Sequence, residues 1–190
     1  FGDSQAFLLS FMSPYLTWAI HVTEYLRREL PHIPLVWGGV HPSAMPEDSM
    51  GYVDYLGRME CEEALPEFLE RMEAGEDLTT VRNFWVRDQD GVIHRNDLRP
   101  AIQDLDSIPP PDYKLEDEWV LHQGNLVPMT EELLARYHTE YYFGQPTYIS
   151  LTTRGCPFMC AYCFNSQLVA AYNSRKIRYR YLDRVIREEI

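Results

Sequence analysis

Short apolar runs alternate with amphipathic segments over the first hundred residues, which is the pattern of a parallel sheet covered by helices. Three apolar runs predict buried strands: residues 6–12, 34–39 and 52–57. Two segments with apolar residues at helical spacing predict helices: residues 14–30 and 61–74. The pattern therefore predicts an α/β fold.

Prolines and glycines mark where these elements end. Pro31 ends the first predicted helix, because proline fixes φ and has no amide hydrogen to donate. Gly75 caps the second helix. Residues 83–95 then alternate apolar and polar positions on either side of Asp90-Gly91, which predicts a β-hairpin.

The second half of the chain begins with a proline-rich segment, residues 104–113, which predicts a stiff connection between domains. Residues 130–141 have the spacing of a helix, and residues 146–153 alternate β-branched and aromatic side chains as a strand does. Residues 181–190 predict another helix, with its apolar side chains on one face. No role follows from the sequence for the acidic and aromatic segment 116–145.

The charge balance narrows the kind of partner. A net charge of −12 repels phosphate backbones and anionic lipids, so we expect a small-molecule substrate and no binding to nucleic acid or membranes. The apolar runs are too short to span a bilayer, and no secretion signal opens the chain. Three of the four cysteines lie close together, unlike a secreted disulfide framework, which favours a cytoplasmic location.

Three thiols are concentrated in the stretch "RGCPFMCAYC", directly after the predicted strand. Cys156, Cys160 and Cys163 have the spacing C-x3-C-x2-C. Three thiolates leave one iron of a four-iron cluster without a protein ligand, so that another molecule can bind there. The alternative is a structural zinc site that takes Cys61 or His138 as its fourth ligand.

This stretch resembles the cluster loop of the radical S-adenosylmethionine (radical SAM) superfamily, in which the same spacing follows the first strand of a partial (β/α) barrel. The resemblance implies that Cys156, Cys160 and Cys163 bind a [4Fe-4S] cluster and that S-adenosylmethionine binds the open iron. Tyr162 would lie near the adenine. An external electron donor, such as flavodoxin or ferredoxin, would then be a partner.

The first two predicted strands also carry a resemblance. Ser10 ends the first strand and Gly38-Gly39 end the second, which resembles the S-x-L and GG elements of the cobalamin-binding Rossmann-like domain. The resemblance implies that these residues contact the nucleotide tail of cobalamin, so that Gly39→Val should weaken binding while folding survives. Met59 and Cys61 stand where that domain has glycines in a G-E-G-E-like turn.

The whole layout resembles the cobalamin-binding radical SAM proteins. Residues 1–100 then correspond to the C-terminal part of a Rossmann-like (flavodoxin-like) cobalamin-binding domain with its hairpin. Residues 101–145 correspond to a linker, and residues 146–190 to the start of a radical SAM barrel. Because the chain opens at Phe1 and stops within a predicted helix, we interpret it as a fragment truncated at both ends and inactive alone.

The resemblance implies a radical SAM enzyme with three cofactors: a [4Fe-4S] cluster, S-adenosylmethionine and cobalamin. A 5′-deoxyadenosyl radical would activate the substrate, most often for methyl transfer to an unactivated carbon. Two alternatives stay open: a radical cyclase or rearrangement enzyme with the same cofactors, and a non-enzymatic zinc or iron–sulfur module. The substrate is not encoded in these residues.

Overall fold

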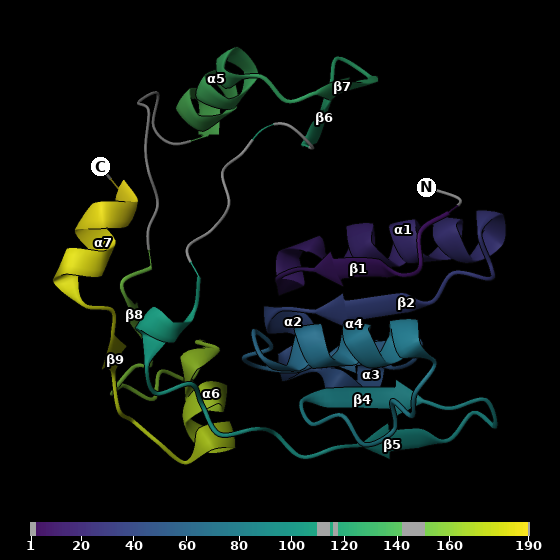
Figure 1. Cartoon of the computed structure of the whole chain (residues 1–190), viewed down its shortest axis with the longest axis horizontal. Helices are drawn as coiled ribbons and strands as arrows, with labels where there is room; N and C mark the ends of the chain where they lie inside the picture. The colour runs from purple at the N-terminus through teal and green to yellow at the C-terminus, as the bar shows by residue number, and fades with distance from the viewer. Residues whose placement is uncertain (1–2, 110–114, 116–117, 142–150, 190) are drawn as a thin grey trace. The chain divides into compact units, whose positions relative to one another are not determined.

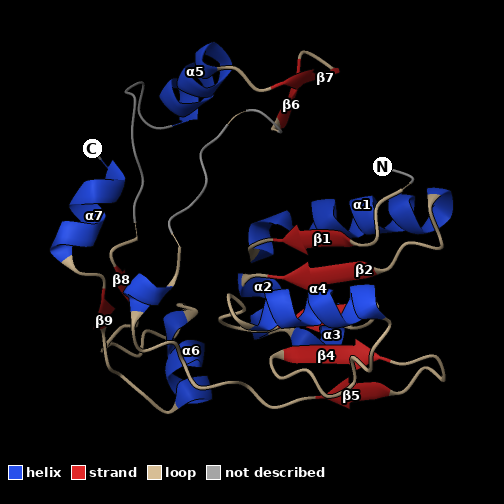
Figure 2. Ribbon diagram, in the orientation of Figure 1, coloured by secondary structure: helices blue, strands red, loops and turns tan. Residues whose placement is uncertain are grey.

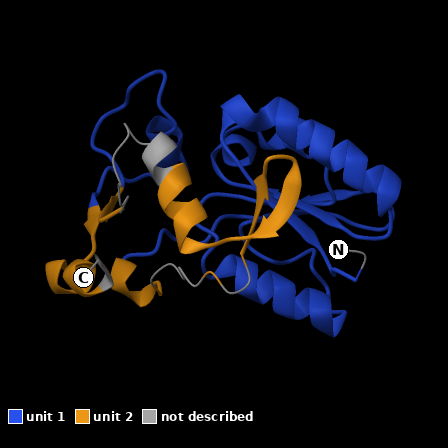
Figure 3. Cartoon of the chain, turned by 90° about the horizontal axis from the view of Figure 1, so that it is seen from above, with its two compact units in different colours: residues 1–103, 155–177 blue, residues 104–154, 178–190 orange. Residues whose placement is uncertain are grey.

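The computed structural model (Figure 1) describes residues 3–109, 115, 118–141 and 151–189. Its helices and strands (Figure 2) fall into two compact units, which Figure 3 colours separately. The first unit contains residues 1–103 and 155–177, and the second contains residues 104–154 and 178–190. The chain therefore leaves the first unit, returns to it and leaves it again.

A five-stranded sheet forms the centre of the first unit, with the strands in the order of the chain. The strands are β1 (Phe7–Ser10), β2 (Leu35–Gly38), β3 (Tyr55–Gly57), β4 (Phe84–Arg87) and β5 (Ile93–Arg95). The first three strands are parallel, and β4 and β5 pair antiparallel at the end of the sheet. The α/β fold, the three predicted strands and the hairpin are therefore confirmed.

Helices connect the strands. The helix α1 (Leu16–Glu29) follows a short 3-10 turn and joins β1 to β2, and α4 (Ala64–Ala74) joins β3 to β4. Both were predicted, and Gly75 ends α4 in the left-handed conformation expected of a glycine cap. Two short helices between β2 and β3, α2 (Val40–Ala44) and α3 (Pro46–Ser49), were not predicted because neither is long enough to show a period.

Each face of the sheet carries a buried cluster, because successive strand residues point to opposite sides. On the α1 face, the buried indole of Trp37 meets Phe11 edge-on, with ring centroids 4.9 Å apart, and donates a hydrogen bond to the Thr23 hydroxyl at 2.9 Å. On the α4 face, Phe68 stacks on Phe84 with centroids 4.1 Å apart. Each such buried ring contributes about 1.5–3 kcal/mol relative to exposure to water.

The aromatic residues of the first helical segment lie away from this core. Tyr15, Trp18 and Tyr25 are 45%, 54% and 56% exposed. The helix packs instead through the fully buried Ala19 and its neighbours one turn away, where a small side chain lets α1 approach the sheet closely. Helical spacing predicted the helix correctly without identifying the face that it buries.

A buried asparagine fixes the turn after β3. Asn83 has no exposed surface and a φ of +73°, and its side-chain amide donates to the carbonyls of Arg58 at 2.9 Å and Glu60 at 3.0 Å. Its side-chain oxygen accepts from the Arg99 amide at 2.7 Å. One side chain therefore joins the turn after β3 to the strand-like segment that follows β5.

The remaining elements follow the chain between and after the two parts of the first unit. They are a 3-10 turn (Leu105–Ser107), β6 (Trp119–His122), β7 (Asn125–Pro128), α5 (Glu131–Tyr141), β8 (Thr153–Arg154), α6 (Asn165–Tyr172), β9 (Arg178–Tyr179) and α7 (Leu182–Glu189). Of these, α6 belongs to the first unit and the others to the second. The structure confirms the predicted helices that became α5 and α7, whereas the hairpin of β6 and β7 was not predicted.

Parts of two predicted segments lie outside the described residues. These parts are residues 110–113 of the proline-rich connection and residues 146–150 of the predicted strand. Across the described ranges, no helix combines the length and the apolar character needed to cross a membrane.

Replacing Asn83 should destabilise the first unit. Asn83→Ala leaves two partly buried carbonyls without this donor and puts alanine at a positive φ, so we expect the free energy of unfolding to fall by about 2–4 kcal/mol. Urea titration followed by tryptophan fluorescence measures it. Asn125→Ala, at an exposed position of β7, is the control and should change stability by less than about 0.5 kcal/mol. Equal, small effects for both variants would contradict this role of Asn83.

Candidate functional site

A groove of about 670 Å³ opens on the α4 side of the sheet and reaches the ends of β1, β2 and β3. Ser10, Gly38 and Gly39 all line it. Ser10 and Gly38 are direct partners in the register of β1 with β2, so the structure brings these sequence-predicted residues together. Leu8 and Leu69, on β1 and α4, are exposed at the groove, which is open to solvent and largely apolar.

Gly39 is required by the fold itself. Its φ is +91°, and a Cβ there would lie 2.8 Å from the Phe11 amide nitrogen and 2.8 Å from the Ser10 hydroxyl. The end of β1 is held at this point, because Phe11 donates to the Gly38 carbonyl at 3.2 Å and accepts from the His41 amide at 3.1 Å. The expectation that Gly39→Val would leave folding intact is therefore wrong: valine would collide with backbone.

Gly38 has a different role. A Cβ built on it would meet the Gly57 carbonyl oxygen at 3.8 Å, which is an ordinary van der Waals distance. Neither a positive φ nor close packing therefore requires glycine at this position. The consequence of the missing side chain is open space in the groove, beside the Ser10 hydroxyl.

His41 follows the two glycines and is held by the core. It is 7% exposed, its Nδ1 lies 3.0 Å from the Ser13 hydroxyl oxygen, and its ring stacks on Phe11 at a centroid distance of 5.6 Å. These contacts indicate that His41 has a structural role at the start of α2.

The turn after β3 forms another wall of the groove. Met59 has a φ of +61°, the left-handed conformation that glycine would adopt most easily, and its amide donates to the Ser43 hydroxyl at 2.8 Å. The Cys61 thiol lies 3.4 Å from the Arg58 carbonyl oxygen. Burial, with a smaller contribution from the Glu62 carboxylate, raises the pKa of the Cys61 thiol to about 12. In the metal-free protein Cys61 is therefore protonated at neutral pH.

The three-thiol loop begins at a glycine that the structure requires. Gly155 has a φ of +103°, and a Cβ there would collide with the Lys176 carbonyl. At the other end of the loop, the Cys163 amide donates to the Cys160 carbonyl at 3.1 Å. The Cys163 carbonyl accepts from the Ser166 hydroxyl at 2.7 Å, so the last thiol is joined directly to the start of α6.

The thiols themselves are accessible. Cys160 is exposed, Cys156 and Cys163 are half-buried, and all three are free. Among the described residues, no three His, Cys, Asp or Glu side chains converge to hold a metal ion, so the loop carries the thiols without preorganising them. As a donor set, three thiols fit a [4Fe-4S] cluster with one open iron. Tyr162 is 93% exposed beside them, and the side chain of His138 lies outside the described residues.

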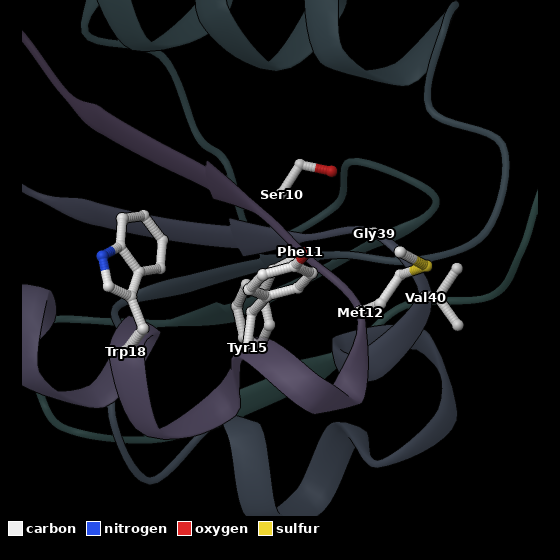
Figure 4. Close-up of a pocket in the computed structure, with 7 residues that line it drawn as sticks. All are labelled: Ser10, Phe11, Met12, Tyr15, Trp18, Gly39 and Val40. Carbon is white, nitrogen blue, oxygen red and sulfur yellow. The ribbon is translucent and has the colours of Figure 1, made fainter. Parts of the chain in front are cut away.

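A second pocket, of about 570 Å³, lies at the end of β1 on the side of α1. Met12, Tyr15, Trp18 and Val40 line it, and the Ser10 side chain points to the other side of β1 (Figure 4). Helical spacing predicts a helix that contains Tyr15 and Trp18, but it does not predict a pocket. The pocket depends on the exposure of these two side chains, and the periodicity of the sequence does not give that exposure.

Comparisons with known sequences give distant relatives. No protein-family model matches the chain. The chain is 29% identical over 135 residues to the uncharacterized methyltransferase PH0819 of Pyrococcus horikoshii, covering 70% of this chain and 25% of that protein. It is 28% identical over 145 residues to the anaerobic magnesium-protoporphyrin IX monomethyl ester cyclase of Synechocystis sp., covering 75% of this chain and 25% of that one. The chain thus spans about a quarter of the length of these relatives.

Solved structures match nearly the whole chain. The cobalamin-dependent S-adenosylmethionine radical enzyme OxsB, with aqua-cobalamin and S-adenosylmethionine bound, superposes with a TM-score of 0.65 at 16% identity, over 98% of this chain and 23% of OxsB. The radical S-adenosylmethionine methyltransferase TsrM from Kitasatospora setae, with cobalamin and a [4Fe-4S] cluster bound, gives 0.55 at 18% identity, over 92% and 31%. The chain therefore has the fold of the cobalamin-dependent radical SAM enzymes, as its sequence predicted.

Proposed function

We propose that this chain is the cobalamin-binding and cluster-binding portion of a radical SAM enzyme that transfers a methyl group to an unactivated carbon. The proposal depends on one juxtaposition: the groove with Gly38 at its floor and the three-thiol loop, Cys156 to Cys163, occur in the same compact unit. The structural similarity to OxsB and TsrM supports the class, and the methyltransferase relative supports the reaction.

The apolar walls of the groove suit the benzimidazole ring of the nucleotide tail of cobalamin, and the open side would leave the ribose and phosphate of that tail in contact with water. The Ser10 hydroxyl offers one hydrogen bond at the end of β1. Gly38 lets the tail pack against backbone, because no side chain stands between the ligand and β2. Gly39 keeps the end of β1 in place beside it.

The thiol loop suits a cluster with one open coordination position. Cys156, Cys160 and Cys163 would bind three irons as thiolates, and the half-buried Cys61 would stay protonated. When bound, the cluster supplies the electron that cleaves S-adenosylmethionine, and cobalamin supplies the methyl group. The exposed Tyr162 ring is available to stack on the adenine. An external donor such as flavodoxin or ferredoxin would supply the electron in a reducing cytoplasm.

A radical cyclase with the same cofactors is the second candidate, supported by the magnesium-protoporphyrin ester cyclase relative. The two reactions differ in the fate of the methyl group. With ¹³C-methylcobalamin, a product carrying the label supports methyl transfer, whereas an unlabelled rearranged product supports cyclisation.

The thiol assignment predicts a specific pattern of iron binding. After anaerobic reconstitution we expect about four irons per chain and the broad visible absorption of a cubane cluster. Replacing Cys156, Cys160 or Cys163 by Ala should abolish it, since each removes a ligand. Cys61→Ala is the matched control and should retain the iron. Stoichiometric zinc that is indifferent to oxygen, or loss of iron in the Cys61 variant, would contradict the assignment.

The groove assignment predicts that the two glycines respond differently to valine. Gly38→Val puts its Cβ at an ordinary 3.8 Å from the nearest backbone atom and adds bulk to the groove, so we expect the Kd for cobalamin to rise at least about tenfold with little change in Tm. Gly39→Val should instead lower the Tm. Ala74→Val, at an exposed position of α4, is the control for added bulk. Isothermal titration and thermal unfolding measure both quantities, and an unchanged Kd in Gly38→Val would refute the groove as the cobalamin site.

A further inference from the structure

Two side-chain hydrogen bonds join the thiol-bearing segment, residues 155–177, to the rest of the first unit. The Tyr172 hydroxyl, at the end of α6, accepts from the Glu60 backbone amide at 3.2 Å. The Lys176 ammonium donates to the Gln103 side-chain oxygen at 3.2 Å. The first of these bonds ends on the turn after β3, which is also a wall of the groove.

The turn that receives Tyr172 is held from several sides. Asn83 donates to the Glu60 carbonyl at 3.0 Å, and the Glu60 carboxylate accepts from the Ile102 amide at 2.9 Å. The preceding Met59 amide donates to Ser43 at 2.8 Å. These contacts hold the peptide groups on either side of the one that carries the Glu60 N–H, and the Tyr172 oxygen accepts from that N–H.

The helix α6 connects this contact to the thiols. Tyr172 is its last residue, and the Ser166 hydroxyl in its first turn bonds to the Cys163 carbonyl. A helix transmits a displacement at one end to the other because its backbone is hydrogen-bonded throughout. Met59 and Cys61, on either side of Glu60, line the groove. A single hydroxyl thus lies between the groove wall and the helix that begins at the last thiol.

We propose that Tyr172 is a positioning residue that holds the three-thiol loop in register with the groove, through its hydrogen bond to the Glu60 amide. The identity of the two bound groups, cobalamin in the groove and a [4Fe-4S] cluster on the thiols, rests on the proposed function. The Tyr172–Glu60 hydrogen bond and its effect on the thiols do not. Any ligand that fixes the turn after β3 should also restrict the thiol loop, and the coupling is reciprocal.

Tyr172→Phe tests the inference, because it keeps the ring and removes only the hydroxyl. In reduced, metal-free protein we expect the Glu60 amide to exchange with solvent about three- to tenfold faster, as loss of one neutral hydrogen bond implies. Alkylation of the half-buried Cys156 and Cys163 by iodoacetamide should accelerate by a similar factor, while the already exposed Cys160 changes little. NMR and mass spectrometry of the labelled peptides measure these rates.

Two controls separate positioning from simple stabilisation. Tyr181→Phe removes a hydroxyl from a ring that is 76% exposed and should change neither rate. Cys61, which is half-buried and has a raised thiol pKa, should react slowly in every folded variant and faster on unfolding. Unchanged alkylation of Cys156 and Cys163 in a folded Tyr172→Phe protein overturns the inference.

If fast alkylation of Cys61 shows that Tyr172→Phe is unfolded, the wild-type protein provides a second, independent test. Cyanocobalamin should then slow alkylation of Cys156 and Cys163 in the wild type about threefold or more. Binding of cyanocobalamin without that slowing overturns the positioning role and leaves the proposed function standing. Failure of cyanocobalamin to bind overturns the proposed function. In that case the alkylation rates of Tyr172→Phe are measured at a lower temperature, at which slow alkylation of Cys61 shows that the variant is folded. Those rates alone then decide the positioning role.

Discussion

The close approach of β1 to Gly39 is the constraint on which the rest of the first unit depends. A positive φ and a missing Cβ let the backbone of Phe11 pass directly over the end of β2, where Gly38 and His41 hydrogen-bond to it. That crossing sets Phe11 against Trp37 and begins α2. Backbone packed against backbone leaves no flexible side chain to absorb an added methyl group, so the geometry is fixed to within tenths of an ångström.

The two faces of the sheet serve different purposes because helices cover them unequally. The face that α1 covers is closed by Trp37, whose one polar atom is satisfied by Thr23. On the other face, α4 packs on the sheet through a cluster that includes Phe68, Phe84 and Val86, and the side of β1 is left as a groove. Packed and open regions therefore lie next to each other on the α4 face of one sheet.

Local sequence patterns correctly predicted the features that depend on residues close together in the chain. Alternation and helical spacing gave the strands, the hairpin and the longer helices, and cysteine spacing gave the thiol loop. The separate roles of Gly38 and Gly39 were not predictable, because they depend on the distance to Phe11 and not on the dipeptide. Asn83 was missed for the same reason, since its partners lie more than twenty residues before it and sixteen after it. Long-range polar contacts leave no period in a sequence.

The three points at which the chain leaves or re-enters the first unit lie together. Gln103, the last residue before the first departure, accepts from Lys176, and Gly155, the first residue after the return, packs against the Lys176 backbone. The intervening segment, residues 104–154, thus begins and ends at the same place in the first unit. Loop-closure entropy grows only logarithmically with length, so doubling that segment would cost about 0.6 kcal/mol. The chain can therefore vary the segment between its groove and its thiols over a wide range of lengths while the first unit keeps its fold.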